Sequence, residues 1–195
     1  MNFEYYQEFL MCQSKGLKQQ SKDALERFIC SFSDFSEKQT WVTENLSDLE
    51  VHSNGRLRNE LFEELVFPVL ADGYKNKQVH LMIWLVKFSK NLYQNQPLWH
   101  KIHGVTPYEI IRECYDLEPE NTEIRDLCLQ LGLEGIQYAI HEWPCGILLG
   151  PDGATKEACQ AELVNVNFLR TLDHSGKYES QLADYENKLH EYMKR

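Results

Sequence analysis

The chain has 195 residues, of which 43% are hydrophobic, and its formal net charge is −10. This length and apolar content favour one globular domain spanning residues 1–195 and exclude a disordered chain. The longest strongly apolar stretch, residues 81–86, is far shorter than the roughly 20 residues that cross a bilayer. The first residues carry acid and lack the apolar segment of a signal peptide, so we expect a cytoplasmic protein.

Acidic residues concentrate in the second half of the chain. Residues 106–195 hold 17 Asp and Glu against 8 Lys and Arg, whereas residues 56–105 hold 4 against 7. An acidic surface attracts basic partners and repels nucleic acid and anionic membranes. We therefore expect a basic protein partner, and neither nucleic acid nor a membrane.

Helical periodicity begins near the N-terminus. Apolar residues recur every three or four positions around residues 3–10, 25–32 and 41–49, which predicts a helix at each. Residues 36–39 read Ser-Glu-Lys-Gln, the form of a capping box, in which the serine hydroxyl and the glutamine satisfy backbone groups of the first turn. We therefore expect the third of these helices to start at Ser36.

The middle of the chain predicts further helices. Residues 56–71 form one, which Pro68 should kink or shorten because proline removes a backbone donor, and Asp72-Gly73 is its expected stop. Residues 78–93 are apolar on nearly all sides, which predicts a central buried helix. Residues 96–104 contain proline and glycine and predict a connecting loop.

Residues 106–117 and 121–143 are the clearest pair of predicted helices. Only residues 118–120 separate them, so the two helices are expected to fold back on each other. Residues 115–121 also resemble the turn between successive tetratricopeptide units, which again implies a helical hairpin. Two further helices, residues 155–174 and 178–193, close the chain.

The expected fold is all-α. No stretch alternates between apolar and polar residues for long enough to predict a sheet. We expect an irregular bundle or stack of antiparallel helical hairpins with about eight or nine helices.

Catalytic and metal-binding candidates are few. The six cysteines form no CxxC pair, so we expect them to be reduced and mainly structural. His100, His103 and His141 are the candidates for a metal site, and Cys145 with His141 for a nucleophile and base, but their spacing matches no zinc motif and no orienting acid is identifiable. The glycine-rich residues 143–153 lack the Lys-Ser/Thr of a phosphate-binding loop. We therefore expect no enzyme activity, metal or cofactor.

Carboxylates follow one face of the helix expected at residues 106–117. Glu109, Glu113 and Asp116 recur at i, i+4 and i+7, and acids continue across the turn with only two arginines among them. Such a face either contacts a basic partner or is an ordinary solvated surface, and both readings stay open. Among the tryptophans, Trp84 is expected in the core and Trp143 as an interface anchor. The candidate partner-binding residues are Glu109, Glu113, Asp116, Glu120, Glu123, Asp126 and Trp143.

The chain resembles the immunity proteins of bacterial contact-dependent growth inhibition systems. The resemblance rests on size, acidity, helical content, cysteine usage and the acidic hairpin from Glu109 to Asp126. It implies a cytoplasmic protein without enzyme activity that blocks the active site of a toxin. The toxin would be the C-terminal domain of a large secreted effector, most simply a ribonuclease.

Two other classes of function stay open. An α-helical scaffold could bind a peptide in a groove between its hairpins, and a metal- or thiol-dependent enzyme could use His100, His103, His141 or Cys145. The locally basic residues between 56 and 101 could also serve a separate contact.

Overall fold

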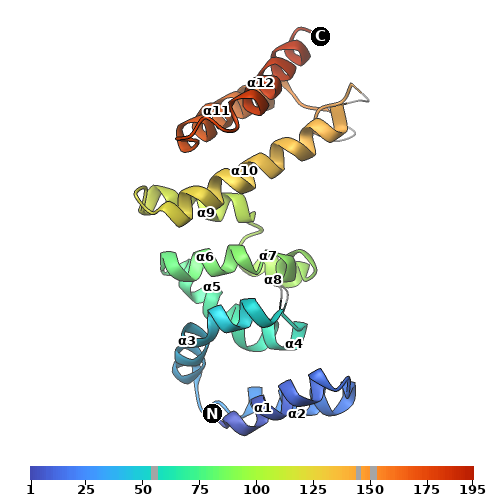
Figure 1. The fold of residues 1–195 in the computed structure, drawn as a ribbon, viewed down its shortest axis with the longest axis vertical. Helices are drawn as coiled ribbons and strands as arrows, with labels where there is room; N and C mark the ends of the chain where they lie inside the picture. The colour runs from blue at the N-terminus through green and yellow to red at the C-terminus, as the bar shows by residue number, and fades with distance from the viewer. Residues whose placement is uncertain (54–56, 144–145, 150–152) are drawn as a thin grey trace. The chain divides into compact units, whose positions relative to one another are not determined.

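A computed structural model describes residues 1–53, 57–143, 146–149 and 153–195 (Figure 1). The structure is 78% helical and has no strand among these residues, which confirms the all-α prediction. Nine of the described helices have seven or more residues, close to the expected eight or nine.

The chain contains two compact units, Met1–Ile110 and Ile111–Arg195. The boundary falls inside α9 (Pro107–Leu117). The expectation of a single domain stays a prediction. The other helices of the first unit are α1 (Phe3–Ser14), α2 (Lys18–Cys30), α3 (Phe35–Ser53), α4 (Asn59–Leu61), the π-helical turn η1 (Phe62–Val66), α5 (Phe67–Lys75), α6 (Val79–Lys87), α7 (Ser89–Tyr93) and α8 (Gln96–Lys101).

An aromatic cluster joins α1, α2 and α3. The ring of Phe28 lies 4.9 Å from that of Tyr6 and 5.1 Å from that of Trp41, measured between centroids. Phe28 and Trp41 are buried, as the helical stripes in the sequence predicted. Aromatic pairs at such distances stabilise a core beyond their buried area.

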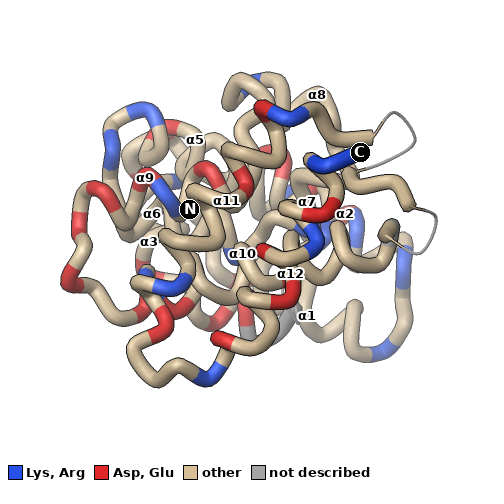
Figure 2. Tube along the Cα trace, turned by 90° about the horizontal axis from the view of Figure 1, so that it is seen from above, with Lys and Arg blue, Asp and Glu red and all other residues tan. Residues whose placement is uncertain are grey.

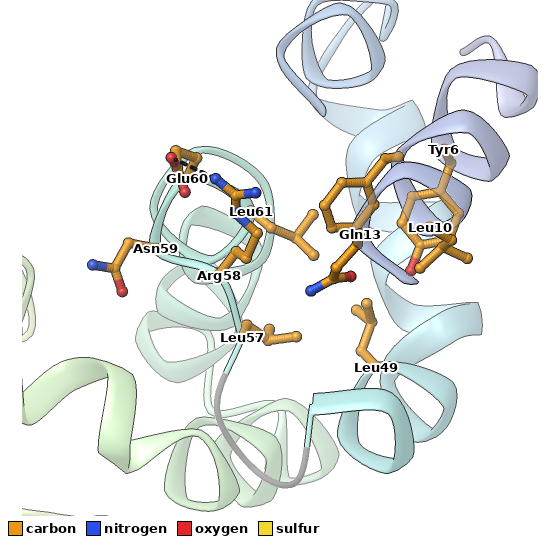
Figure 3. Close-up of a pocket in the computed structure, with 10 residues that line it drawn as sticks. Tyr6, Leu10, Gln13, Leu49, Leu57, Arg58, Asn59, Glu60 and Leu61 are labelled. Carbon is orange, nitrogen blue, oxygen red and sulfur yellow. Dashed lines mark hydrogen bonds and ion pairs between the residues drawn. The ribbon is translucent and has the colours of Figure 1, made fainter. Parts of the chain in front are cut away.

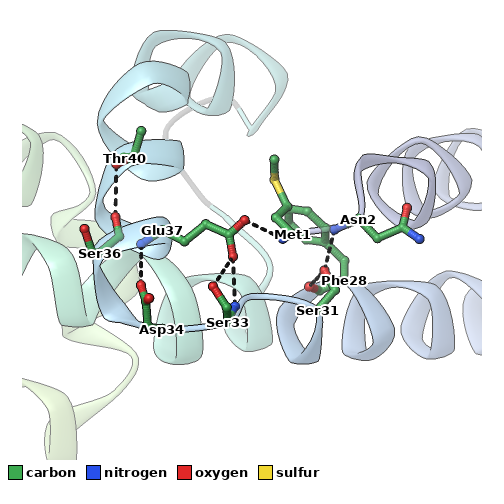
Figure 4. A network of polar contacts seen from close by, with 9 residues as sticks. All are labelled: Met1, Asn2, Phe28, Ser31, Ser33, Asp34, Ser36, Glu37 and Thr40. Carbon is green, nitrogen blue, oxygen red and sulfur yellow. Dashed lines mark hydrogen bonds and ion pairs between the residues drawn. The ribbon is translucent and has the colours of Figure 1, made fainter.

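The start of α3 differs from the expected one. Asp34, not Ser36, accepts the capping hydrogen bond, from the backbone N–H of Glu37 at 2.9 Å. The Glu37 carboxylate in turn accepts hydrogen bonds from the backbone N–H and the hydroxyl of Ser33, and it pairs with the terminal ammonium of Met1 (Figure 4). The predicted start was therefore two residues too late, because the Asp34 carboxylate caps the first turn and the Glu37 carboxylate bonds back to Ser33.

Pro68 does not end the helix that contains it. Instead, η1 widens the turn before the proline, and the backbone N–H of Phe67 bonds to the carbonyl of Phe62. The ammonium of Lys38 donates to the carbonyl of Glu64 at 3.3 Å. This carbonyl is the one that an N–H at position 68 would have bonded, so a side chain replaces the donor that proline lacks.

The stop expected at Asp72-Gly73 is wrong, since α5 continues to Lys75. Gly73 instead allows α6 to approach, because a Cβ at this position would lie 2.5 Å from the Cβ of Leu81. A glycine inside a helix can therefore mark close packing as well as an end.

The helix predicted at residues 78–93 is divided at Phe88 into α6 and α7. Trp84 is half-buried rather than fully buried, and the ammonium of Lys87 lies 4.4 Å from its ring centroid. The loop predicted at residues 96–104 contains α8, because Asn95 caps the N–H of Leu98 and Pro97 lies in the first turn, where its missing donor costs nothing.

The second unit contains the rest of α9 followed by α10 (Thr122–Glu142), α11 (Lys156–Leu172) and α12 (Glu179–Met193). All four helices agree with the predicted segments to within about two residues. The side chains of Asn121 and Thr155 cap the starts of α10 and α11. Gly132 allows close packing of α10 on α11, since a Cβ there would lie 2.4 Å from Leu169 Cδ2.

Two glycines of α10 provide a matched test of this packing. We expect Gly132→Ala to destabilise the protein, because overpacking costs about 1–3 kcal/mol and Leu169 is fully buried. Gly135→Ala meets no atom within 4 Å and should stabilise the protein by about 0.4–1 kcal/mol. Urea denaturation of both variants measures the difference, and equal effects would show that α10 does not approach α11 as described.

The Glu37 contacts predict a pH dependence of stability. The bond from the Met1 ammonium, followed by that from the Ser33 N–H, lowers the pKa of Glu37 from 4.5 to about 2. The folded state therefore binds this proton more weakly than the unfolded state, so the stabilisation is complete above pH 4.5 and is lost as the pH falls towards 2. Urea midpoints measured between pH 7 and pH 3 should fall less steeply for Glu37→Gln than for the unaltered chain.

Candidate functional site

The predicted acidic face begins with a residue that has a structural role. The Glu109 carboxylate accepts hydrogen bonds from the backbone N–H of Thr106 at 2.7 Å and from its hydroxyl at 2.8 Å. The N–H of Glu109 in turn bonds to the Thr106 hydroxyl at 3.2 Å. This reciprocal capping box holds the start of α9, so Glu109 is already engaged within its own helix.

The most exposed carboxylates lie at the turn between α9 and α10. We call Asp116, Leu117, Glu118 and Glu120 the acidic turn; all four are exposed, and Leu117 keeps 48% of its surface accessible. Within the described part of the chain, no hydrogen bond or ion pair reaches the carboxylates of Asp116 and Glu120, whereas Glu118 accepts one from the Asn121 side chain at 3.0 Å. An apolar side chain surrounded by acids is therefore presented to solvent.

Neither nearby arginine neutralises the acidic turn. The guanidinium of Arg112 lies 3.5 Å from the centroid of the Phe168 ring on α11, and its Nε is buried. The edge of the Tyr115 ring meets the same phenylalanine at 5.4 Å. Arg125 bonds to the neighbouring Asp126 at 2.9 Å. The cations thus face other groups, which leaves the turn with excess negative charge.

The whole second unit reinforces this field. It holds 16 Asp and Glu against 8 Lys and Arg, a balance of −8, whereas the first unit holds 14 against 12. The charged positions are marked along the chain in Figure 2. Exposed charges act over a screening length of about 8 Å at physiological salt, so the excess is felt near the surface of this unit.

A groove of about 610 Å³ follows α10 from the end that carries the acidic turn. Leu129 and Leu133 lie nearly buried in it, together with Leu172 from the end of α11. Polar side chains line the rest of the groove, namely Arg125, Asp126, Gln130, Glu134, Gln137, Asp173, His174, Ser175 and Tyr178. An apolar floor with a polar rim is the usual composition of a protein-binding surface.

Asp173 fixes the far wall of the groove. Burial would raise the pKa of this carboxyl, but hydrogen bonds from the Tyr178 N–H, the Ser175 hydroxyl and the Lys177 N–H lower it below its usual value. These bonds close the turn between α11 and α12. Asp173 therefore shapes the groove without offering a free carboxylate to a ligand.

The remaining predicted partner-binding residues do not all lie at the acidic turn or in the groove. Asp126 lies in the groove, Glu123 is exposed in the first turn of α10, and Glu113 is half-buried on α9. Trp143 lies beyond the opposite end of α10, about 30 Å away along the 21-residue helix. Its ring packs against that of Tyr192 at 5.5 Å, so it joins α10 to α12.

The described structure does not bring together the histidines that were candidates for a metal or catalytic site. Among the described residues, no three His, Cys, Asp or Glu side chains are placed to share a metal ion. His100 and His103 are exposed in the first unit and His141 is exposed in the second, while Cys145 lies outside the described residues. The five described cysteines are free.

Two of the free thiols are poor nucleophiles. Burial raises the pKa of both Cys114 and Cys128 to about 12. At neutral pH each is therefore a protonated thiol, a poor nucleophile that packs as a small apolar side chain.

A second cavity, with both apolar and polar walls, was not predicted from the sequence. It has a volume of about 540 Å³ and lies in the first unit, where Leu57 and Leu61 point across it toward Leu10 and Leu49 (Figure 3). Arg58 and Glu60 form an ion pair at 3.2 Å beside it. Three separate segments contribute its walls, so helical periodicity alone gives no sign of it.

The chain matches no protein-family model, no curated protein and no solved structure. In the described chain, no helix combines the length and apolar character needed to span a bilayer. The groove and the acidic turn are therefore the features from which a function can be inferred.

The effect of the Glu109 cap on stability can be separated from the effect of losing one surface charge. We expect Glu109→Ala to lower the free energy of unfolding by about 0.5–1 kcal/mol, because it removes one half of the capping box. Asp116→Ala removes the same charge from the same helix without breaking a described bond, so its effect should stay within about 0.5 kcal/mol. Thermal and urea unfolding of the two variants make the comparison, and equal losses would contradict the assignment.

Proposed function

We propose that this chain is a cytoplasmic immunity protein that binds a basic nuclease toxin domain through the acidic turn and the adjoining α10 groove. The toxin domain would be the C-terminal part of a secreted effector, as in contact-dependent growth inhibition. The observation that supports the proposal is the exposed, unneutralised acid of the turn, with Arg112 held against Phe168 instead.

Electrostatics gives the acidic turn its suggested role. A nuclease active site concentrates cationic groups that bind phosphates, and carboxylates can occupy the same positions. Complementary charge also accelerates association, which an inhibitor of a toxic enzyme requires. The exposed Leu117 and the leucine floor of the groove would add apolar contact, which charge alone does not supply.

A peptide-binding scaffold is the second candidate, favoured by the volume and leucine floor of the α10 groove. The two functions respond differently to salt. Electrostatically steered association slows strongly as ionic strength rises, whereas insertion of an apolar helix into a groove does not.

The genomic neighbour supplies the first test. The gene for a large secreted effector beside this one would provide the cognate toxin domain, and co-expression of this chain should then restore growth to cells that produce that domain. A neighbouring metabolic operon, or unrelieved toxicity, would count against the immunity function.

Charge reversal tests the binding surface with that toxin domain. We expect Asp116→Lys/Glu120→Lys to slow association by about tenfold or more at low salt, because rim charges mainly set the association rate. The control Glu44→Lys/Glu191→Lys changes the net charge equally at exposed sites elsewhere and should alter the rate by less than about twofold. Surface plasmon resonance at two ionic strengths measures both, and equal slowing would mean that net charge, not the acidic turn, attracts the partner.

A further inference from the structure

The α10 groove has the length of a short helix. Its lining residues on α10 run from Arg125 to Gln137, a span of about 18 Å at the rise of an α-helix. The opposite wall comes from the end of α11, the turn after it, and Tyr178 just before α12. A partner helix of about 12 residues, or roughly three turns, matches this span.

The floor of the groove repeats at helical spacing. Leu129 and Leu133 stand one turn apart on α10, and Leu172 adds a third apolar side chain from the end of α11. The exposed fraction of each is 9% or less, so the core holds all three in place. The apolar anchors of an amphipathic helix recur at the same spacing, at i, i+3, i+4 and i+7.

The walls favour a helix over an extended peptide. An extended peptide leaves its backbone N–H and C=O groups to be satisfied by the surface that binds it, usually a sheet edge. The α10 wall is a continuous helix that makes its backbone bonds internally, and the Asp173 bonds close the turn on the other side. A helix satisfies its own backbone before it binds, so it is the form of peptide that suits this groove.

The exposed rim on α10 is acidic. Glu134 accepts a hydrogen bond from the Gln130 side chain through Oε1 at 2.9 Å, and no ion pair reaches it within the described part of the chain. Arg125 is the one Lys or Arg among the residues that line the groove. Both of its bonds to Asp126 end on Oδ1, at 3.1 and 2.9 Å, and its third contact is His174 Nδ1 at 3.3 Å. Glu134 and Oδ2 of Asp126 therefore remain open to cations from a partner.

We infer that the α10 groove binds a basic amphipathic helix of the partner protein. The apolar stripe of that helix lies on the leucine floor, and its lysines or arginines face Glu134 and Asp126. Charge complementarity assigns a basic rather than an acidic helix, because the second unit holds 16 Asp and Glu against 8 Lys and Arg. The inference rests on the proposed function, since it names the element of the basic partner that enters the groove.

Three synthetic peptides of about 14 residues test the inference without a toxin. The first has leucines at the a and d positions of a heptad and lysines elsewhere. The second has the same composition in an order without an apolar stripe, and the third has glutamate in place of lysine. Fluorescence anisotropy should show saturable binding of the first peptide, at least about tenfold tighter than that of the other two.

Variants of the exposed rim locate the binding. Glu134→Lys should weaken the first peptide about three- to tenfold, and Gln137→Glu, which adds an acid to the rim, should strengthen it about two- to fivefold. The matched controls Glu191→Lys and Gln160→Glu make the same changes at exposed positions outside the groove, and each should alter the affinity less than about twofold. Circular dichroism checks that all four variants fold.

Equal affinity for the first two peptides would overturn the inference, and so would equal effects of the rim variants and their controls, because charge alone would then explain binding. A dimer of the chain that Glu134→Lys dissociates in sedimentation would assign the groove to a second copy and overturn it as well. Neutralisation of the cognate toxin domain without peptide binding would contradict this inference alone. Peptide binding in the groove without neutralisation would instead contradict the immunity function.

Discussion

The contact of Arg112 with Phe168 determines the character of the second unit. The Arg112 guanidinium lies 3.5 Å from the centroid of the Phe168 ring and so joins α9 to α11. Arg112 is one of only two cations between Glu109 and Asp126, and this contact holds it against a ring instead of against the acids. Partial burial strengthens such a cation–π contact, because less water competes for the charge. The same interaction therefore packs the helices and leaves the acidic turn unneutralised.

The two units carry different kinds of surface feature. The first has a cavity with apolar and polar walls at the start of α4, and the second has carboxylates at the α9–α10 turn beside a groove with a leucine floor. Both features lie at helix ends. Side chains at helix ends are held in place by capped backbone, yet they remain accessible to a partner or ligand.

Local sequence signals explain most of the helices, and contacts between distant residues explain the main errors. The segments that became α9, α10, α11 and α12 were predicted closely, because Pro107, Asn121 and Thr155 mark helix starts without help from distant residues. The errors came from long-range contacts. Local spacing predicts a stop at Gly73, which instead packs against Leu81. The donor missing at Pro68 is accommodated by η1 and by Lys38, which lies 26 residues from Glu64.

The sequence by itself determined the all-α class, most helix positions and the excess of acid in the second half, because periodicity, capping and charge are local or additive properties. Only the tertiary structure decided which carboxylates remain available. It packed Trp143 against Tyr192 of α12 and turned Arg112 onto Phe168 of α11. It also assembled the α10 groove and the cavity at the start of α4 from separate segments. These outcomes depend on which side chains meet across helices. Helical spacing determines on which face of its helix a side chain lies, but not which side chain of another helix it contacts.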